Sequence, residues 1–371
     1  MNSSPEPGRD DVRGQLAAEG VGLWLDDYHR GRLVDGSLNR LVAGGLALGV
    51  ASRPAAVARA VSATTAYREQ LDRQAGRGLS ADERAYALMA EDAREACAVL
   101  DPVYRATKGM HGWVSLGIAP GLVTDAAAMV DRSRRLVDMV GRPNVLIRIP
   151  VAGRGLAAAT ELLASRIGVH ISSVFSVRRY AQAVEAHFRG LERASRDGSA
   201  TPPAASLVSL DIGHLNAGVD ALLDARADPA AGALRGRAGL TVARLMYRRY
   251  EESLGSPRWR PLVAGGALPQ RLLWSSENAP ACPRAALGRL EQFVAWMTVH
   301  ALPQSALETL DSVDGLRGDT LSGEYGSACR ALDDLGRAGV IMDTVASGLE
   351  AAALRRERAA WKELLSAAQA G

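Results

Sequence analysis

The chain has 371 residues, of which 47% are hydrophobic and 23% charged, enough for one large barrel-type domain or two ordinary ones. Its 44 basic and 41 acidic residues nearly balance, which argues against a nucleic acid or a membrane surface as partner. The 3 cysteines, Cys97, Cys282 and Cys329, lie far apart without CxxC or Cys/His spacing, so we expect free thiols and no metal site.

Residues 1–20 are polar and lack the apolar core of a signal peptide. We expect them to form a flexible N-terminal arm. No later segment reaches membrane-spanning length without charges, so the sequence predicts a cytoplasmic protein.

Short apolar runs rich in β-branched residues alternate with longer stretches of helical spacing. In chain order, the predicted strands are Gly22–Asp27, Leu46–Ser52, Trp113–Ala119, Val145–Val151, Gly168–Phe175, Ser206–Ile212, Leu272–Glu277 and Trp296–Ala301. The predicted helices include Ala55–Ala75, Ala81–Leu100, Ala126–Val140, Ala157–Arg166, Val177–Ser195, Leu234–Leu254, Cys329–Leu335 and Ala346–Ala368. This alternation predicts a single-domain (β/α)8 TIM barrel over residues 21–371, with an open doubly wound sheet as the structural alternative. Pro202-Pro203 and Ala225–Gly232 are predicted to be surface connections.

Several separate segments, in the same order along the chain, carry a resemblance to a known family. They are Leu23–Asp27, Arg142–Ile147, Leu234–Gly236, Tyr247–Glu252, Ser256–Trp259, Gln270–Arg271, Leu273–Trp274 and Arg317–Thr320. From about Gly22 to its C-terminus, the chain resembles transaldolases of the longer bacterial type. The resemblance implies a barrel, and a reaction that moves a dihydroxyacetone unit between sugar phosphates through a lysine Schiff base.

The position of that lysine is occupied by arginine. The family has an Ile-Lys-Ile-Pro context on the fourth strand, and this chain has Ile147-Arg148-Ile149-Pro150. An arginine guanidinium keeps its charge, with a pKa above about 12, so it cannot replace a neutral amine nucleophile. The only lysines are Lys108, which precedes the third predicted strand on the side away from the expected active site, and Lys362 in the last predicted helix. We expect neither to substitute.

Other positions implied by the resemblance have also changed. The acidic residue of the third strand corresponds to Gly117, and the Thr-Ser-Asn-Pro turn after the second strand corresponds to Ala51–Pro54. The asparagine of the fifth strand corresponds to His170, and a phosphate-binding arginine after the sixth strand corresponds to His214. Where an anion-binding Arg or Lys is expected after the seventh strand, the chain has Ser275–Asn278. Asp26, Ser172 and Ser209 retain the residue types of the family.

The period of two along barrel strands predicts which side chains face inward. These are Trp24, Asp26, Arg148, His170, Ser172, Ser209, Asp211, Trp274 and Ser276. The candidate catalytic residues are Asp26, Arg148, His170 and His214. The candidate substrate-binding residues are Arg53, Ser172, Ser209, Asp211, Ser276 and Glu277. We expect a small anionic ligand and neither a cofactor nor a metal.

The basic residues of this set predict a cationic barrel mouth. Its charge should rise as the pH falls through the histidine range near about 6.5. Each of these residues also has a less specific, purely structural interpretation. Arg148 could form a buried ion pair with Asp26, His170 could be a hydrogen-bonded core residue, and Asp211 could cap a turn. Gly213 suggests a loop before His214.

Three functional hypotheses follow from these positions. The first is a divergent enzyme that acts on a carbonyl-bearing or anionic metabolite by acid/base and electrostatic chemistry without a lysine. Such an enzyme would suit a specialised biosynthetic pathway. The second is a non-catalytic binding protein on the same scaffold. The third is a residual true transaldolase. Fold alone does not decide between them, because function depends on the site.

Overall fold

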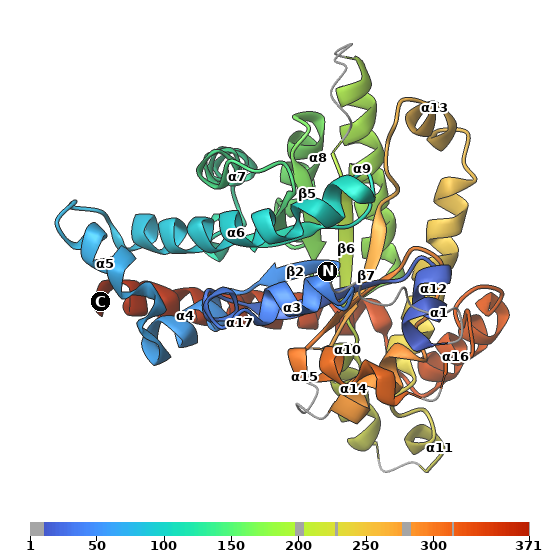
Figure 1. Ribbon diagram of the computed structural model, residues 1–371. Coiled ribbons are helices and arrows are strands. Elements are labelled where there is room, and N and C mark those ends of the chain that lie inside the picture. Colours follow the sequence, from blue (N-terminus) through green and yellow to red (C-terminus); the bar gives the residue numbers. More distant parts are fainter. Residues whose placement is uncertain (1–10, 197–203, 227–228, 277–282, 314, 371) are drawn as a thin grey trace.

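The computed structural model describes residues 11–196, 204–226, 229–276, 283–313 and 315–370, and its strands form a closed parallel barrel (Figure 1). The strands are β1 Gly22–Tyr28, β2 Gly49–Ser52, β3 Trp113–Gly117, β4 Val145–Pro150, β5 Gly168–Ser172, β6 Ser206–Asp211, β7 Arg271–Ser275 and β8 Val299–Leu302. They pair in chain order, and β1 closes the ring against β8, with Trp24 opposite Ala301. The predicted (β/α)8 barrel is confirmed, and the open sheet is excluded.

Helices follow the strands and surround them (Figure 1). The α-helices are α1 Val12–Ala18, α2 Gly31–Val34, α3 Ser37–Ala43, α4 Pro54–Ala63, α5 Arg68–Ala75, α6 Ala81–Ala106, α7 Ala126–Val140, α8 Gly155–Ala164, α9 Val177–Arg196, α10 Ile212–Asp224, α11 Pro229–Gly232, α12 Ala238–Leu254, α13 Trp259–Ala264, α14 Pro283–Leu290, α15 Gln304–Glu308, α16 Tyr325–Arg337 and α17 Met342–Ala370. Single 3-10 turns are η1 Thr65–Tyr67, η2 Pro120–Leu122 and η3 Leu310–Ser312.

Two apolar clusters hold the barrel together. The smaller fills the barrel interior with side chains such as Trp24, Trp113, Leu146 and Leu273. The larger lies between the strands and their helices and includes Ile147 of β4. Because successive side chains of a strand point to opposite faces, β4 sends Leu146 inward, Ile147 outward and Arg148 inward again.

Several predicted element boundaries differ from the structure. The helix predicted over Ala55–Ala75 is interrupted at Thr64, whose backbone is extended and whose side chain accepts a hydrogen bond from the Ala66 amide. The eighth strand begins at Val299 rather than at Trp296, because Met297 has a left-handed backbone (φ 63°) that a strand cannot accommodate. Part of the connection predicted at Ala225–Gly232 forms the short helix α11.

The predicted N-terminal arm is wrong for the part that the structure describes. Residues 12–18 form α1, and both Val12 and Leu16 are buried. The Gln15 side chain also accepts a hydrogen bond of 2.7 Å from the amide of Leu316. Residues 1–10, Cys282 and Pro202-Pro203 lie outside the described residues, whereas Cys97 and Cys329 are free thiols as predicted. No helix of the described chain is long and apolar enough to cross a membrane.

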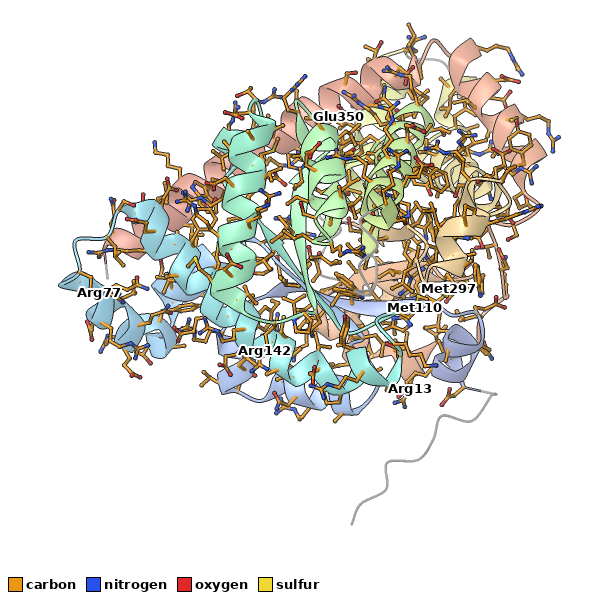
Figure 2. The ribbon with its side chains drawn as sticks, turned by 90° about the horizontal axis from the view of Figure 1, so that it is seen from above. Arg13, Arg77, Met110, Arg142, Met297 and Glu350 are labelled. Carbon is orange, nitrogen blue, oxygen red and sulfur yellow. The ribbon has the colours of Figure 1, made fainter. Side chains whose placement is uncertain are left out.

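The N-terminal end of the barrel is closed by Arg271, the first residue of β7. Its guanidinium donates 2.8 Å hydrogen bonds to the carbonyls of Met297 and Met110, which Figure 2 shows side by side and well apart from Glu350 of α17. Lys108 is exposed two residues before Met110. It therefore lies at the end of the barrel opposite the carboxyl ends of the strands, as predicted.

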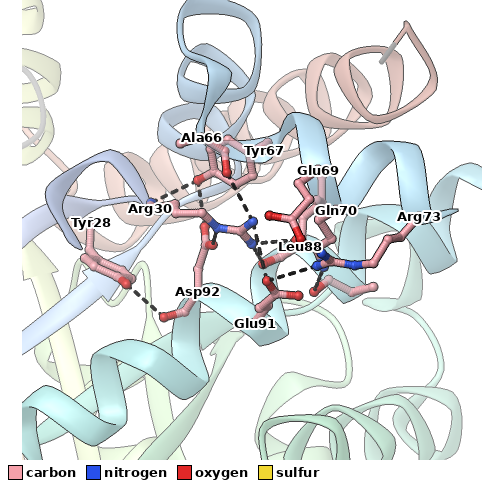
Figure 3. Close-up of polar contacts among 11 residues, drawn as sticks. Tyr28, Arg30, Ala66, Tyr67, Glu69, Gln70, Arg73, Leu88, Glu91 and Asp92 are labelled. Atoms are coloured by element: carbon pink, nitrogen blue, oxygen red, sulfur yellow. Dashed lines mark hydrogen bonds and ion pairs between the residues drawn. The ribbon is translucent and has the colours of Figure 1, made fainter. Parts of the chain in front are cut away.

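A buried polar network holds the chain where it leaves β1 (Figure 3). Asp92 of α6 is fully buried and accepts 2.7 Å hydrogen bonds from Arg30 Nε and from the Tyr67 hydroxyl. Tyr28, the last residue of β1, donates to the carbonyl of Asp92 (2.8 Å). Burial raises the pKa of Asp92 to about 6, while the Arg30 charge opposes this shift. The network fixes the segment that follows Asp26 and Asp27.

Side-chain contacts hold helix α17 against α9 and α6 on either side of the barrel mouth. In its first half, Arg179 of α9 donates hydrogen bonds to both oxygens of the buried Glu350 carboxylate (2.9 and 2.8 Å). Farther along, the Trp361 indole donates to Asp82 of α6 (3.0 Å), and its ring lies 5.0 Å from that of Tyr86. The part of α17 between these two contacts lies over the carboxyl ends of the barrel strands, where it lines the cavities described below.

We predict that Asp92→Ala lowers the free energy of unfolding by about 3–5 kcal/mol, because it leaves the mostly buried Arg30 guanidinium without its hydrogen-bonded carboxylate and only the longer contact to Glu91 (3.6 Å). Urea unfolding followed by tryptophan fluorescence measures the change. Asp72→Ala, at an exposed position of α5, is the matched control and should change stability by less than about 0.5 kcal/mol. Equal effects of the two substitutions would contradict a structural role for the network.

Candidate ligand site at the barrel mouth

The carboxyl ends of the strands surround an inner pocket of about 60 Å³. Two larger cavities adjoin it, an outer cavity of about 300 Å³ and a side cavity of about 240 Å³. The inner pocket is lined by Asp26, Ala51, Arg53, Arg148, His170, Ser172, Ser173, Phe175, Ser209, Asp211, Leu273, Ser275, Ala301, Ala353, Arg356 and Glu357. Seven of the ten candidate residues from the sequence therefore meet in one place.

Arg148 lies beside Gly117 in the register of β3 and β4. A β-carbon added at residue 117 would lie 3.3 Å from Nη2 of Arg148, closer than ordinary van der Waals contact. Glycine at this position therefore leaves room for the guanidinium. Within the part of the chain that the structure describes, no hydrogen bond or ion pair joins Arg148 to another residue. Its charge is left available at the mouth.

Asp26 forms its ion pair with Arg53 and not with Arg148. Arg53 donates from Nε to Oδ1 (2.9 Å) and from Nη2 to Oδ2 (2.6 Å), a two-point contact that suits a planar guanidinium. Arg53 can reach Asp26 because it immediately precedes α4 with an extended backbone. The Asp26–Arg148 pair considered from the sequence is therefore wrong.

His170 is almost fully buried, at 3% exposure. Its Nδ1 lies 2.8 Å from the Ser115 hydroxyl, and its Nε2 has no hydrogen-bond partner in the described chain. Burial, followed by the charges of Arg148 and Arg53, lowers the pKa of His170 well below its usual range. The predicted rise in His170 charge near pH 6.5 is therefore wrong, and the ring stays neutral there.

His214 lines the outer cavity and is oriented by Asp211. Its Nδ1 lies 2.8 Å from Oδ2 of Asp211, and its amide donates to Oδ1 (2.9 Å). Because a carboxylate oxygen accepts, Nδ1 carries the proton and Nε2 is the basic nitrogen. Asp211 also caps α10, as the less specific interpretation predicted. The loop expected at Gly213 is wrong, since this residue lies in the first turn of α10.

The serines of the site differ in their placement. Ser172 and Ser209 line the inner pocket, and the buried Ser172 hydroxyl has no partner among the described residues. On β7, the predicted inward pair is wrong. Leu273 belongs to the interior cluster and Ser275 lines the inner pocket. Trp274 instead packs 6.1 Å from the Phe293 ring on the outer side of the strand.

Of the remaining candidates, Ser276 lines the side cavity rather than the inner pocket. Glu277 lies outside the described residues.

Residues from α17 line the pocket and were missed in the sequence. They are Ala353, Arg356 and Glu357, and the last two also line the outer cavity. Ser275 was missed as well, because the start of β7 could not be placed to within one residue. For α17 no signal in the sequence could have identified these residues, since helical periodicity does not say which face meets a distant barrel.

No group of three or more His, Cys, Asp or Glu residues suited to a metal occurs in the described ranges. Lys362 is exposed on α17 and lines none of these cavities. Two buried polar atoms at the inner pocket, Nε2 of His170 and Oγ of Ser172, lack partners among the described residues. Both atoms are therefore available to hydrogen-bond a group that enters the inner pocket.

Fold and site together define a (β/α)8 protein with a polar ligand site at the carboxyl ends of its strands, the usual position in such barrels. Residues 23–368 match the family described as Transaldolase/Fructose-6-phosphate aldolase. The chain belongs to this family.

Curated relatives cover almost the whole chain. A protein called "Transaldolase" from Acidothermus cellulolyticus is 37% identical over 96% of each chain. Those of the same name from Frankia alni and Thermobifida fusca are 36% and 38% identical over 95% of each chain. Among solved structures, a citrate lyase from Burkholderia xenovorans LB400 has a TM-score of 0.28 at 11% identity over 61% of this chain and 83% of its own. That last likeness carries no argument.

Because His170 is neutral in the folded protein, we can predict how the free energy of unfolding depends on pH. In the unfolded chain its imidazole binds a proton near pH 6.5, whereas in the folded protein it does so only at much lower pH. Stability therefore falls as the pH drops below about 6.5. In His170→Asn this loss between pH 6.5 and 5 should be smaller by about 1.4 kcal/mol per pH unit.

Urea unfolding at pH 5, 6 and 7 measures this slope in both proteins. His187→Phe is a positive control, because burial lowers the pKa of His187 to about 3 as well. If His170→Asn keeps the full slope while His187→Phe reduces it, then His170 is charged in the folded protein and our account of its environment is wrong.

Proposed function

We propose that this protein binds a sugar-phosphate-like metabolite at the barrel mouth and acts on it without forming a lysine imine. The observation that carries the proposal is Arg148. It stands on β4 beside Gly117, without a carboxylate partner in the described chain. The resemblance implies that this is the position of the family's reactive lysine. A guanidinium in this state is suited to binding an anion and unsuited to nucleophilic attack.

The cavities favour a ligand that extends from the inner pocket outward. About 60 Å³ accommodates only a small group, to which Nε2 of His170 and Oγ of Ser172 can offer hydrogen bonds. The outer cavity of about 300 Å³ takes the rest of the molecule. A carbonyl or hydroxyl end fits the inner position, since both protein groups are neutral and at least one can donate.

Proton transfer next to the carbonyl is the reaction class that this arrangement supports. His214 is the base, because Asp211 holds its Nδ1–H and leaves Nε2 basic at the outer cavity. Arg148 holds the anionic group and orients the ligand, while neutral His170 stabilises charge on the carbonyl oxygen by hydrogen bonding. Asp26 is not assigned a proton-transfer role, since Arg53 takes both of its oxygens.

Ordinary transaldolase activity is the second candidate, and a specific observation favours it. Full-length relatives called transaldolase are 36% to 38% identical to this chain. The imine experiment below separates the two candidates, because transaldol transfer in this family depends on the lysine amine.

We predict that fructose 6-phosphate forms no adduct with this protein that borohydride can trap. The exposed Lys108 and Lys362 are far from the mouth or outside its cavities, so neither can form an imine with a bound ketone. Intact-mass measurement after reduction detects an adduct, and a family member that has the lysine serves as positive control. A stoichiometric adduct on either lysine would support the transaldolase candidate and overturn ours.

We also predict that phosphate binding depends on Arg148. Calorimetric titration at pH 7.5 should show saturable binding to the native protein. It should be at least tenfold weaker in Arg148→Met, because hydrogen bonds to charged groups contribute about 1.5–3 kcal/mol.

Arg142→Met is the matched control, since Arg142 is exposed just before the amino end of β4. Its affinity should stay within about twofold of the native value. Equal binding in Arg148→Met and the native protein would remove Arg148 from the site.

A further inference from the structure

Arg356 of α17 shares two cavities with Arg148 of β4. Both residues line the inner pocket and both line the outer cavity, so they lie at the passage between the two. They come from opposite sides of this passage, one from the barrel and the other from the helix that lies over it. An anionic group in the passage would therefore lie beside both residues.

The fold fixes the position of this part of α17. Arg356 stands between the contact of Glu350 with α9 and the contact of Trp361 with α6. Ala353, one turn before Arg356, also lines the inner pocket, and Ala360, one turn after it, lines the outer cavity. Because residues three and four apart share one face of a helix, this face of α17 is the one directed at the mouth.

The charges around the passage leave two cations without a carboxylate. Asp26 pairs with Arg53, and Asp27 pairs with Arg59 at 3.2 Å. For Arg148 and Arg356, neither an ion pair nor a hydrogen bond is found within the described ranges.

Two further carboxylates line the cavities: Glu357 lines both, and Asp211 lines the inner pocket. Asp211 holds His214, and Glu357 has an interaction of its own. Two arginines without a partner in the described chain therefore favour an anionic group at the passage.

We propose that Arg356 is a ligand-binding residue and that it binds a single phosphate group together with Arg148. A phosphate monoester carries about 1.5 to 2 negative charges near pH 7 and three acceptor oxygens, whereas a carboxylate carries one charge and two oxygens. Phosphate therefore matches the two guanidiniums better. This inference rests on the proposed anion-binding function and adds to it the nature and the second ligand of the anion.

The phosphate position differs from the one that the resemblance implies. The family has a phosphate-binding arginine after the sixth strand, and this chain has His214 there, held by Asp211. In our proposal the phosphate is bound by Arg356 of the last helix and not by a residue at the position of His214. His214 is released from anion binding and can act in proton transfer.

Calorimetric titration with inorganic phosphate at pH 7.5 tests the proposal on the full chain. Arg356→Gln should weaken binding at least tenfold and leave the melting temperature unchanged, because Arg356 is exposed and without a partner in the described chain. Arg355→Gln and Arg358→Gln are matched controls on the same helix. Both are exposed and line none of the mouth cavities, so each should stay within about twofold of the native affinity.

The stoichiometry of the titration tests whether one phosphate contacts both arginines. If it does, the native protein should bind one phosphate per chain, and Arg148→Met and Arg356→Gln should each weaken that one binding event. Two phosphates per chain, with each substitution removing a different one, would overturn the single-phosphate claim. Acetate should bind at least tenfold more weakly than phosphate, and equal affinity would overturn the choice of phosphate.

The outcomes separate this inference from the proposed function. Native affinity in Arg356→Gln, or an equal loss in Arg355→Gln and Arg358→Gln, overturns the role of Arg356 while Arg148 stands. Absence of saturable phosphate binding to the native protein overturns both.

Discussion

The two-point ion pair between Asp26 and Arg53 determines the charge of the barrel mouth. Asp26 is the acidic residue on β1 that could have neutralised Arg148, and Arg53 occupies both of its oxygens. Arg148 is half-buried, and a guanidinium removed from part of its water without a carboxylate partner is favoured by a bound anion. The Asp26–Arg53 ion pair thus gives Arg53 and Arg148 different roles. Arg53 is structural, and Arg148 is left for a ligand.

The space for the Arg148 side chain depends on Gly117, which lies on β3, two strands along the barrel from Asp26 on β1. A guanidinium is longer and wider than the end of a lysine, and the absence of a side chain at Gly117 gives it room beside β3, since a β-carbon there would lie 3.3 Å from Nη2 of Arg148. Gly117 and Arg148 are therefore coupled sterically. The resemblance implies that the family has an acid and the reactive lysine at these two positions, and this is the basis of our proposal of chemistry without an imine on a transaldolase-family scaffold.

The fold could be predicted from the sequence because its signals are local and repeat along the chain. Each β-branched run is followed by a helical stretch, and this alternation specifies the parallel barrel. The wrong predictions came from strand positions that were misplaced by one residue and from contacts between residues far apart in the sequence. On β7 an offset of one residue exchanged Leu273 and Ser275 for Trp274 and Ser276, because the side-chain period is two.

The partner of Asp26 and the role of Arg356 depend on tertiary contacts that no local pattern encodes. Arg53 and Arg148 were both candidates, and only the backbone path before α4 decides which one reaches the carboxylate. Arg356 is one of several arginines on α17, and the contacts of Glu350 and Trp361 decide which of them faces the mouth. Burial, likewise, decides that His170 stays neutral.

A crystal structure with fructose 6-phosphate bound tests the central claim most directly. Our account predicts a phosphate oxygen within hydrogen-bond distance of Arg148, about 2.7–3.2 Å, with Asp26 still paired to Arg53 and the sugar not covalently attached. Arg148 turned onto Asp26 with the phosphate elsewhere, or a bond between the sugar and a lysine, would contradict it.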